Sequence, residues 1–239
     1  MATYPRYTLI WDGCTVHVTW QCHNLAWLLQ EDWAKQRYYD LLYKYKERYE
    51  VVIHSYDFMS NHPHFTASLQ GSKENFSAFL RIVNSQFARF INRRLQRRGQ
   101  VCMDRFKSPV IQDDATHLHV MTYGNLNPVR AGITDHPRHY RWTSYHYYAD
   151  GRADPLITPA PAYLALGPTS HVRQFVYRQM IDEILAHEAM IKRSYSSCPF
   201  LGNPTWVLER HADLRRYRLA KTAACQRRQR RLAQTLAPP

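Results

Sequence analysis

Residues 51–69 contain two β-forming segments separated by a tight turn, and this arrangement limits the possible fold more than any other feature of the sequence. Val, Ile, Tyr and Phe are frequent in residues 51–59, and such side chains favour strands. Residues 62–69 alternate between polar and apolar, which is typical of a strand with two different faces. A Ser-Asn pair, common in turns, separates the segments. The polar face of the second segment would carry His62, His64, Thr66 and Ser68.

Further segments with regular patterns surround this hairpin. Residues 14–20 alternate as a strand does, and residues 31–49 favour a helix. Apolar residues recur at spacings of three and four over residues 72–99, which predicts a long amphipathic helix beginning after a Ser cap and ending at a Gly. Residues 101–112 are expected to be extended, and residues 113–127 to form a shorter helix that stops before a proline. This order predicts an α+β domain, with a mainly antiparallel sheet and its helices packed on one side.

Composition changes along the chain predict three parts among the 239 residues. Residues 1–150 would form the principal domain. Residues 151–169 hold four prolines and two glycines, which predicts a linker or an irregular wrap. Residues 170–239 would form a helical, basic extension.

The net charge is +13 and is concentrated in two segments. Residues 75–100 hold six arginines and no acidic residue, and residues 210–239 hold eight arginines and one lysine against one aspartate. A solvated face would carry interspersed acidic residues, so their absence favours a phosphate-bearing partner such as nucleic acid.

The sequence contains no feature expected of a membrane or secreted protein. No apolar run of about 18 residues predicts a membrane-spanning helix, and the first residues do not resemble a secretory signal. Five scattered cysteines do not suggest a disulfide framework. We therefore expect a cytoplasmic protein.

Two short motifs contain residues suited to metal and phosphate chemistry. His62 and His64 are two residues apart, and strand residues at that spacing point to the same side, where their imidazoles can share a divalent metal ion. Tyr123 and Asn127 are four apart near a predicted helix end, so they share a face. A tyrosine hydroxyl can form a covalent intermediate, and an amide oxygen can ligate a metal. Each motif alone is more often structural, because histidine pairs and tyrosines have many ordinary roles.

Four sequence blocks in a fixed order add weight to these motifs. They are Tyr56-Asp-Phe-Met59-Ser-Asn61-His62-Pro-His64-Phe, Asp104-Arg105-Phe106-Lys107-Ser108, Tyr123-Gly-Asn-Leu-Asn127-Pro-Val-Arg-Ala-Gly132 and Tyr140-Arg-Trp142-Thr-Ser144-Tyr145. Together they resemble the REP-associated tyrosine transposases of the single-tyrosine, HUH-type transposase and endonuclease superfamily, in the IS200-like transposase family. The resemblance runs from about residue 5 to residue 168.

The resemblance implies a ferredoxin-like α+β domain that cleaves and transfers DNA strands. His62, His64 and Asn127 would bind Mg²⁺ or Mn²⁺, and Tyr123 would be the nucleophile that forms a 5′-phosphotyrosine. The substrate would be single-stranded DNA, often beside a hairpin such as a repetitive extragenic palindrome. Because the superfamily contains enzymes of both kinds, monomer and homodimer remain open.

Cations near these motifs are expected to contact DNA phosphates. Most of them fall in the second half of the predicted 72–99 helix. The predicted DNA-binding residues are Arg89, Arg93, Arg94, Arg97, Arg98, Arg105, Lys107 and Arg130. The basic segment from Arg210 to Arg231 would either clamp a hairpin stem or remain solvated.

Two residues depart from the family pattern. Pro63 stands where an aliphatic residue is usual, and Gly124 follows the tyrosine where a larger apolar residue is usual. Neither change removes a catalytic group. They leave two hypotheses: an active DNA transposase, or a catalytically weak or inactive, domesticated DNA-binding protein that recognises hairpin repeats. An RNA-binding protein with a similar sheet would leave the histidine and tyrosine blocks unexplained.

Overall fold

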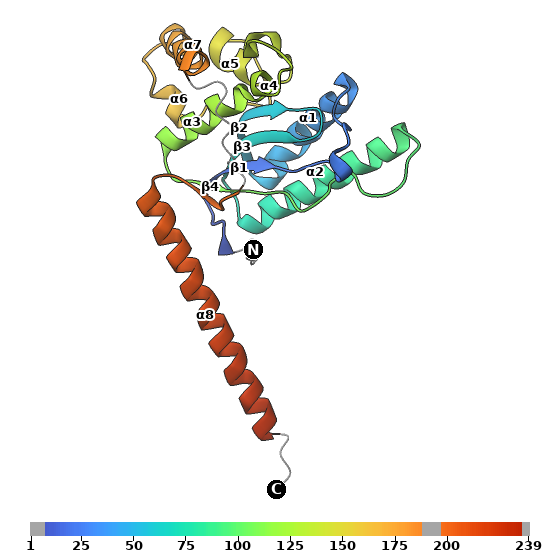
Figure 1. The fold of residues 1–239 in the computed structure, drawn as a ribbon, viewed down its shortest axis with the longest axis vertical. Helices are drawn as coiled ribbons and strands as arrows, with labels where there is room; N and C mark the ends of the chain where they lie inside the picture. The colour runs from blue at the N-terminus through green and yellow to red at the C-terminus, as the bar shows by residue number, and fades with distance from the viewer. Residues whose placement is uncertain (1–7, 188–196, 236–239) are drawn as a thin grey trace.

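The computed structural model describes residues 8–187 and 197–235, which form a sheet covered by helices and one long projecting helix (Figure 1). The core consists of β1 (Thr15–Thr19), α1 (Asp32–Lys46), β2 (Val51–Phe58), β3 (Pro63–Leu69), α2 (Lys73–Arg94), β4 (Val110–Ile111) and α3 (Asp114–Asn125). It is followed by α4 (Asn127–Arg130), α5 (Tyr145–Asp150), α6 (Pro161–Leu164), α7 (Ser170–His187), β5 (Phe200–Leu201) and α8 (Pro204–Thr235). Short 3₁₀ turns lie at η2 (His23–Leu25), η3 (Glu47–Tyr49) and η4 (Pro137–His139).

The five strands form one sheet in the order β2-β3-β1-β4-β5. The first six elements follow the βαββαβ order of ferredoxin-like domains, and β1 pairs antiparallel with both β3 and β4. The predicted α+β class is therefore confirmed. The sheet also gains a strand that the sequence did not reveal, because β5 pairs parallel with β4.

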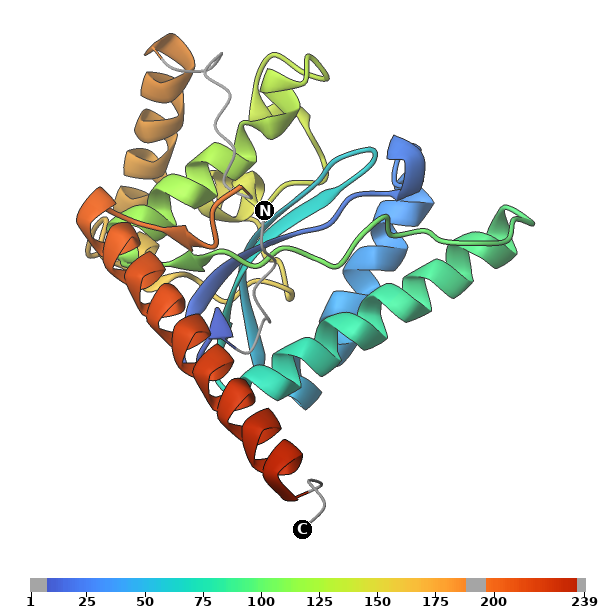
Figure 2. The ribbon, with the colours of Figure 1, turned by 60° about the horizontal axis from the view of Figure 1, so that its bottom comes forward.

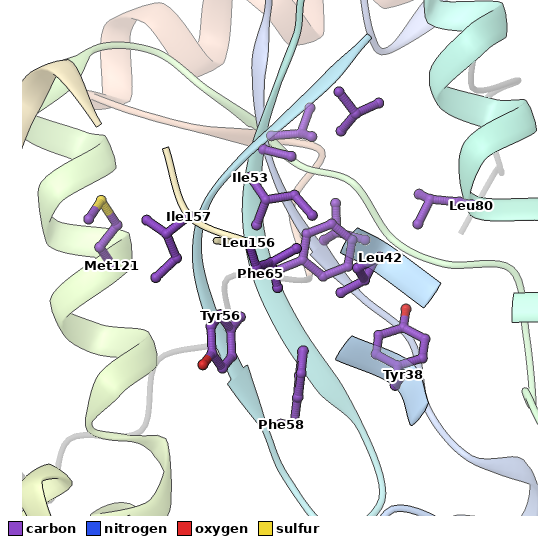
Figure 3. Packing of buried hydrophobic residues seen from close by; sticks show 14 of the residues in the cluster. Tyr38, Leu42, Ile53, Tyr56, Phe58, Phe65, Leu80, Met121, Leu156 and Ile157 are labelled. Atoms are coloured by element: carbon purple, nitrogen blue, oxygen red, sulfur yellow. The ribbon is translucent and has the colours of Figure 1, made fainter. Parts of the chain in front are cut away.

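One face of the sheet carries the apolar core. Figure 3 shows Tyr38 and Leu42 of α1 beside Phe58 and Phe65 of the hairpin. The Tyr38 hydroxyl accepts a hydrogen bond from Trp20 Nε1 at 2.8 Å, so the polar atom of this buried ring is satisfied. The long helix α2 covers the same face with buried side chains at spacings of three and four: Phe76, Phe79, Leu80, Val83, Phe87 and Ile91.

The opposite face is polar, and α3 covers it (Figure 1). Register pairs Ser55 with Thr66 and Asp57 with His64, so these four residues lie on this side of the hairpin. His117 Nε2 of α3 lies 2.9 Å from Thr66 Oγ1. The helices α1 and α2 therefore pack on one side of the sheet as expected, whereas the third helix, α3, lies on the other side, which the sequence did not predict. Polar side chains that alternate with the core residues require hydrogen-bond partners, and α3 supplies them.

The start of α2 agrees with the sequence pattern, and its end does not. Ser72 Oγ accepts a hydrogen bond from the backbone of Asn75, as a cap of α2 should. However, α2 ends at Arg94 rather than at Gly99, and Gln96 has a left-handed φ of 49°. Arg97 and Arg98 therefore lie in the following loop.

The segment 151–169 lies along the edge strand β2. Ile157 forms a parallel bridge with Ile53, and the backbone N–H of Thr158 donates to the Ile53 carbonyl at 2.8 Å. The Lys46 ammonium donates to the Pro155 carbonyl at 2.6 Å. These contacts join the segment to the sheet, while the boundaries of the three predicted parts remain predictions.

The long helix α8 leaves the body of the molecule after β5 and projects away from it (Figure 2). Leu214 is buried near its start, whereas Leu208 and Leu219 are exposed. Within the described residues, no helix combines the length and apolar character needed to cross a bilayer.

We predict that the buried imidazole of His117 makes folding stability depend on pH. Burial lowers its pKa from 6.5 to about 3. The unfolded chain therefore takes up a proton that the folded chain excludes, and stability is lost as pH falls below about 6.5. At pH 5 this one group costs about 2 kcal/mol relative to pH 7.5. Urea unfolding of His117→Gln, which can still bond Thr66, should show a smaller loss between the two pH values. An unchanged loss would contradict this assignment.

Candidate active site

His62 directly precedes β3 and His64 is its second residue, so both follow the turn that joins β3 to β2. Their ring centroids are 4.7 Å apart and the rings are nearly perpendicular. Burial lowers the pKa of both imidazoles, and that of His64 falls well below its ordinary value. Neutral imidazoles are the form that binds a metal. The structure therefore brings the two predicted ligands together in the required protonation state.

A third histidine, which no sequence motif indicated, lies against His64 of this pair. His17 Nε2 is 3.0 Å from His64 Nδ1, and the two rings stack with centroids 5.1 Å apart. His17 belongs to β1, whose register places its polar residues on the same sheet face as Thr66. The alternation in residues 14–20 indicates a strand in which His17 lies on the polar face. Only the sheet order shows that this strand lies beside the strand that carries His64.

The hydrogen bonds of the histidine pair determine which ring nitrogens remain available. His62 Nδ1 contacts Asn61 Oδ1 at 2.5 Å, and His64 Nδ1 contacts His17. Both contacts use Nδ1, which leaves Nε2 of each ring available for another partner. A partner on one imidazole nitrogen selects the tautomer and orients the other nitrogen.

Tyr123 and Asn127 are joined by Arg130. The chain passes from α3 to α4 at Leu126, so the two residues do not share one uninterrupted helix. The guanidinium of Arg130 donates to the Tyr123 carbonyl, and to Asn127 Oδ1 at 3.0 Å. The same guanidinium stacks on the Tyr123 ring, 3.5 Å from its centroid. Tyr123, Asn127 and Arg130 thus form one cluster.

Arg130 also connects this cluster to the histidine pair. Its positive charge is close enough to lower the pKa of His64, after the larger effects of burial and of His62 and His17. It likewise acts to lower the pKa of Asp57, which pairs with His64 across the hairpin. Packing places the motifs together as well: Gly124, next to Tyr123, lies against the Asp57 carboxyl, and Asp57 pairs with His64, so the fold brings the two motifs to one region.

The donor set suits a divalent ion in part. Two neutral imidazoles are good ligands for such ions. Among the residues that the structure describes, no group of three His, Cys, Asp or Glu side chains is arranged to hold a metal. A third protein ligand would have to come from the Asn127 amide, whose oxygen accepts a hydrogen bond from Arg130. The ligand role of Asn127 remains a prediction.

A buried hydrogen-bond network holds the end of α3 against β2. Asp57 Oδ1 accepts hydrogen bonds from Thr143 Oγ1 at 2.6 Å and from Asn125 Nδ2 at 3.2 Å. The hydroxyl of Tyr177 in α7 donates to Asn125 Oδ1 at 2.7 Å. Burial raises the pKa of the Asp57 carboxyl to about 8. Because Asn125 is two residues from Tyr123, this network positions the tyrosine.

The network also explains the glycine beside the tyrosine. A Cβ atom added to Gly124 would lie 2.6 Å from Asp57 Oδ2, much closer than a carbon and an oxygen can approach. Glycine is therefore required by close packing between α3 and the buried carboxyl. The buried Asp57 carboxyl occupies the space that a side chain at position 124 would need, and this explains why Gly124 departs from the family pattern.

The predicted DNA-binding cations lie on α2, in the segment that follows α2, and in the tyrosine cluster. Arg89 is bonded to Ser85 within α2, Arg94 stacks over Trp33, and Arg97 donates to the Gln100 carbonyl. Arg130 lies within the tyrosine cluster. The exposed members are Arg89, Arg93, Arg94, Arg98, Arg105 and Lys107, and Arg97 is partly exposed. Their contacts with DNA remain predictions.

Comparison with known proteins supports the resemblance found in the sequence. The family model described as IS200-like transposase matches residues 11–122, a range that includes His17, His62 and His64 and ends one residue before Tyr123. A solved structure of a REP-associated tyrosine transposase bound to a REP hairpin matches with a TM-score of 0.53. The two chains are 20% identical, and the match covers 67% of this chain and 93% of the other. At that identity the likeness shows a shared fold. No curated protein gives a significant match.

We predict that Gly124→Ala destabilises the protein through the Asp57 carboxyl. The added methyl group would overpack a buried contact and cost about 1–3 kcal/mol, despite the higher helix propensity of alanine. Urea unfolding of Gly124→Ala, Asp57→Ala and the double variant forms a cycle that isolates the pair. In the Asp57→Ala background the glycine substitution should cost much less. Equal costs in both backgrounds would mean that Asp57 is not the cause.

Proposed function

We propose, on the premise that residues 11–122 match the IS200-like transposase family, that this chain is a DNA transposase. It would cleave single-stranded DNA and transfer the strand through a 5′-phosphotyrosine on Tyr123. The observation that carries the proposal is the single region formed by the two motifs: Gly124, next to Tyr123, packs against Asp57, and Asp57 pairs with His64 across the hairpin. Its expected location is the cytoplasm, as a monomer or homodimer.

The reaction needs few protein groups. The Tyr123 hydroxyl oxygen attacks phosphorus and loses its proton, and the P–O3′ bond breaks. The released 3′ oxygen of the upstream segment takes up a proton, and the downstream segment stays linked to the tyrosine through its 5′ phosphate. The energy of the phosphodiester is kept in the phosphotyrosine bond, so a second 3′-hydroxyl can reverse the step and join another strand. No nucleoside triphosphate is consumed.

The remaining residues bind and orient the phosphate. Mg²⁺ or Mn²⁺, held by His62, His64 and Asn127, would stabilise the charge that develops on a non-bridging phosphate oxygen. The guanidinium of Arg130 holds the tyrosine ring and provides a positive charge beside it. The Asp57–Asn125 contact keeps the last turn of α3 in place, so the hydroxyl can be presented in one direction.

The proposed partner is single-stranded DNA next to a hairpin similar to a repetitive extragenic palindrome. A solved relative in fold is bound to a REP hairpin, which supports this choice. Exposed cations on and after α2 provide phosphate contacts that need no base sequence.

The alternative is a domesticated DNA-binding protein with weak or no catalytic activity. The hydrogen bond from Arg130 to Asn127 favours it, because the amide oxygen would have to leave that bond to ligate a metal. Gly124 no longer favours it, since the glycine is explained by Asp57. The two functions differ in turnover, so one experiment separates them.

We predict metal-dependent cleavage that requires the Tyr123 hydroxyl. A 5′-labelled hairpin oligonucleotide from the DNA flanking the gene, with single-stranded arms, is incubated with the protein and Mn²⁺ or Mg²⁺. Wild-type protein should give a shortened strand and a covalent protein–DNA adduct on denaturing gels. Tyr123→Phe and EDTA should abolish both, whereas Tyr43→Phe, at an exposed tyrosine of α1, should not.

Two other outcomes have distinct meanings. Cleavage retained in Tyr123→Phe would exclude the tyrosine mechanism. A shift on native gels without cleavage or adduct, over several flanking sequences, would support the DNA-binding alternative.

We also predict that His17 strengthens metal binding by orienting His64. Loss of a partner that orients a metal-binding histidine typically weakens metal affinity about 10- to 100-fold. Titration of Mn²⁺ followed by electron paramagnetic resonance should show this loss in His17→Ala and partial recovery in His17→Gln, which can still bond His64. His139→Ala, at an exposed histidine, is the matched control. Equal Mn²⁺ affinity in His17→Ala and the control would show that His17 is only structural.

A further inference from the structure

We propose that Trp27, with Leu25 and Met103, forms a platform on which one unpaired base of the DNA strand stacks beside the cleaved phosphate. The three side chains are 64%, 59% and 39% exposed. Trp27 and Leu25 lie on one loop, and Met103 lies on the segment whose backbone is bonded to the start of that loop. Large apolar side chains exposed in one region favour a binding partner that covers them. This inference rests on the proposed function and specifies how the strand is held.

The loop that carries Trp27 is fixed to the turn before the histidine pair. The backbone N–H of Leu29 donates to the Ser60 carbonyl at 2.9 Å, and that of Cys22 donates to the Asn61 carbonyl at 2.8 Å. Asn61 Nδ2 in turn contacts the Leu25 carbonyl at 3.4 Å. Since Asn61 directly precedes His62, the turn that bonds the Trp27 loop also leads into the histidine pair.

The backbone of this loop is held in an uncommon conformation. Asn24 and Leu25 have left-handed φ values of 53° and 56°. Leucine rarely adopts such values, and strained residues of this kind persist where the surroundings hold them in place. The result is that Leu25 is directed to solvent on an anchored loop. A preorganised platform loses little conformational entropy when a base binds.

A second segment completes the platform and supplies charge. The backbone of His23 donates to the Val101 carbonyl at 2.8 Å, and that of Met103 donates to the Gln21 carbonyl at 2.8 Å. Further along the same segment, Lys107 pairs with Thr19, which is the register partner of His64. Residues 101–107 therefore run beside the loop towards the candidate active site.

Charge and size favour a nucleotide as the occupant. Arg105 and Lys107 are exposed on the segment that carries Met103. A flat apolar group flanked by cations matches a base joined to its phosphates, and aromatic stacking binds unpaired bases with little dependence on sequence. Three side chains are too few for a stable protein interface. The adjoining histidine pair would hold the phosphate of the same strand.

The test measures base stacking directly. Oligonucleotides carrying 2-aminopurine at each unpaired position in turn are titrated with full-length Tyr123→Phe protein, which binds without cleaving. At one position the fluorescence should be quenched, and Trp27→Ala should remove the quenching and weaken DNA binding about 10-fold. Trp27→Phe should retain most of both effects.

The control is Trp11→Ala. Trp11 is 43% exposed and precedes β1, at the strand end opposite to Thr19 and His64. It should change neither quenching nor affinity. If Trp27→Ala behaves like Trp11→Ala while DNA still binds, the platform is wrong and the proposed function stands. If the protein binds none of the oligonucleotides and the cleavage experiment also fails, the proposed function itself is wrong.

Discussion

The contact between Asp57 of β2 and Asn125 of α3 is the interaction on which the candidate active site depends. A carboxyl group placed in the interior needs hydrogen-bond donors, and Asn125 and Thr143 supply them. The hydrogen bond from Asn125 to Asp57 holds the last turn of α3 against the sheet. Two consequences follow at adjacent positions: Gly124 must lack a side chain, and Tyr123 is presented next to the strand that carries His64.

The two faces of the sheet have different roles, because one carries apolar side chains and the other carries polar side chains that need hydrogen-bond partners. Phe65 and its neighbours on one face pack against α1 and α2 and contribute stability through apolar burial. The other face presents imidazoles and hydroxyls, which α3 covers only in part, so His62 and His64 stay accessible. Partial burial lowers the pKa of both imidazoles and so favours their neutral form. The neutral form is the one that a metal site would require.

Local patterns predicted what depends on near neighbours. Alternation in residues 62–69 predicted the two faces of β3, and the start of α2 after Ser72 followed from a cap that acts within three residues. The end of α2 was missed because several arginines have good helix propensity and mask the break after Arg94. The two-residue strand β5 was missed because its pairing with β4 joins segments about 90 residues apart.

Residue types at short spacing were enough to predict the α+β class, the histidine pair, the Tyr123 and Asn127 motif and the concentration of positive charge, because each of these features depends on near neighbours in the chain. The folded chain was needed to show that α3 covers the polar face, that His17 contacts His64, and that Gly124 packs against the Asp57 carboxyl. These relations arise between elements far apart in the chain. They depend on which buried polar groups can find partners once the sheet has formed, and no local pattern encodes that choice.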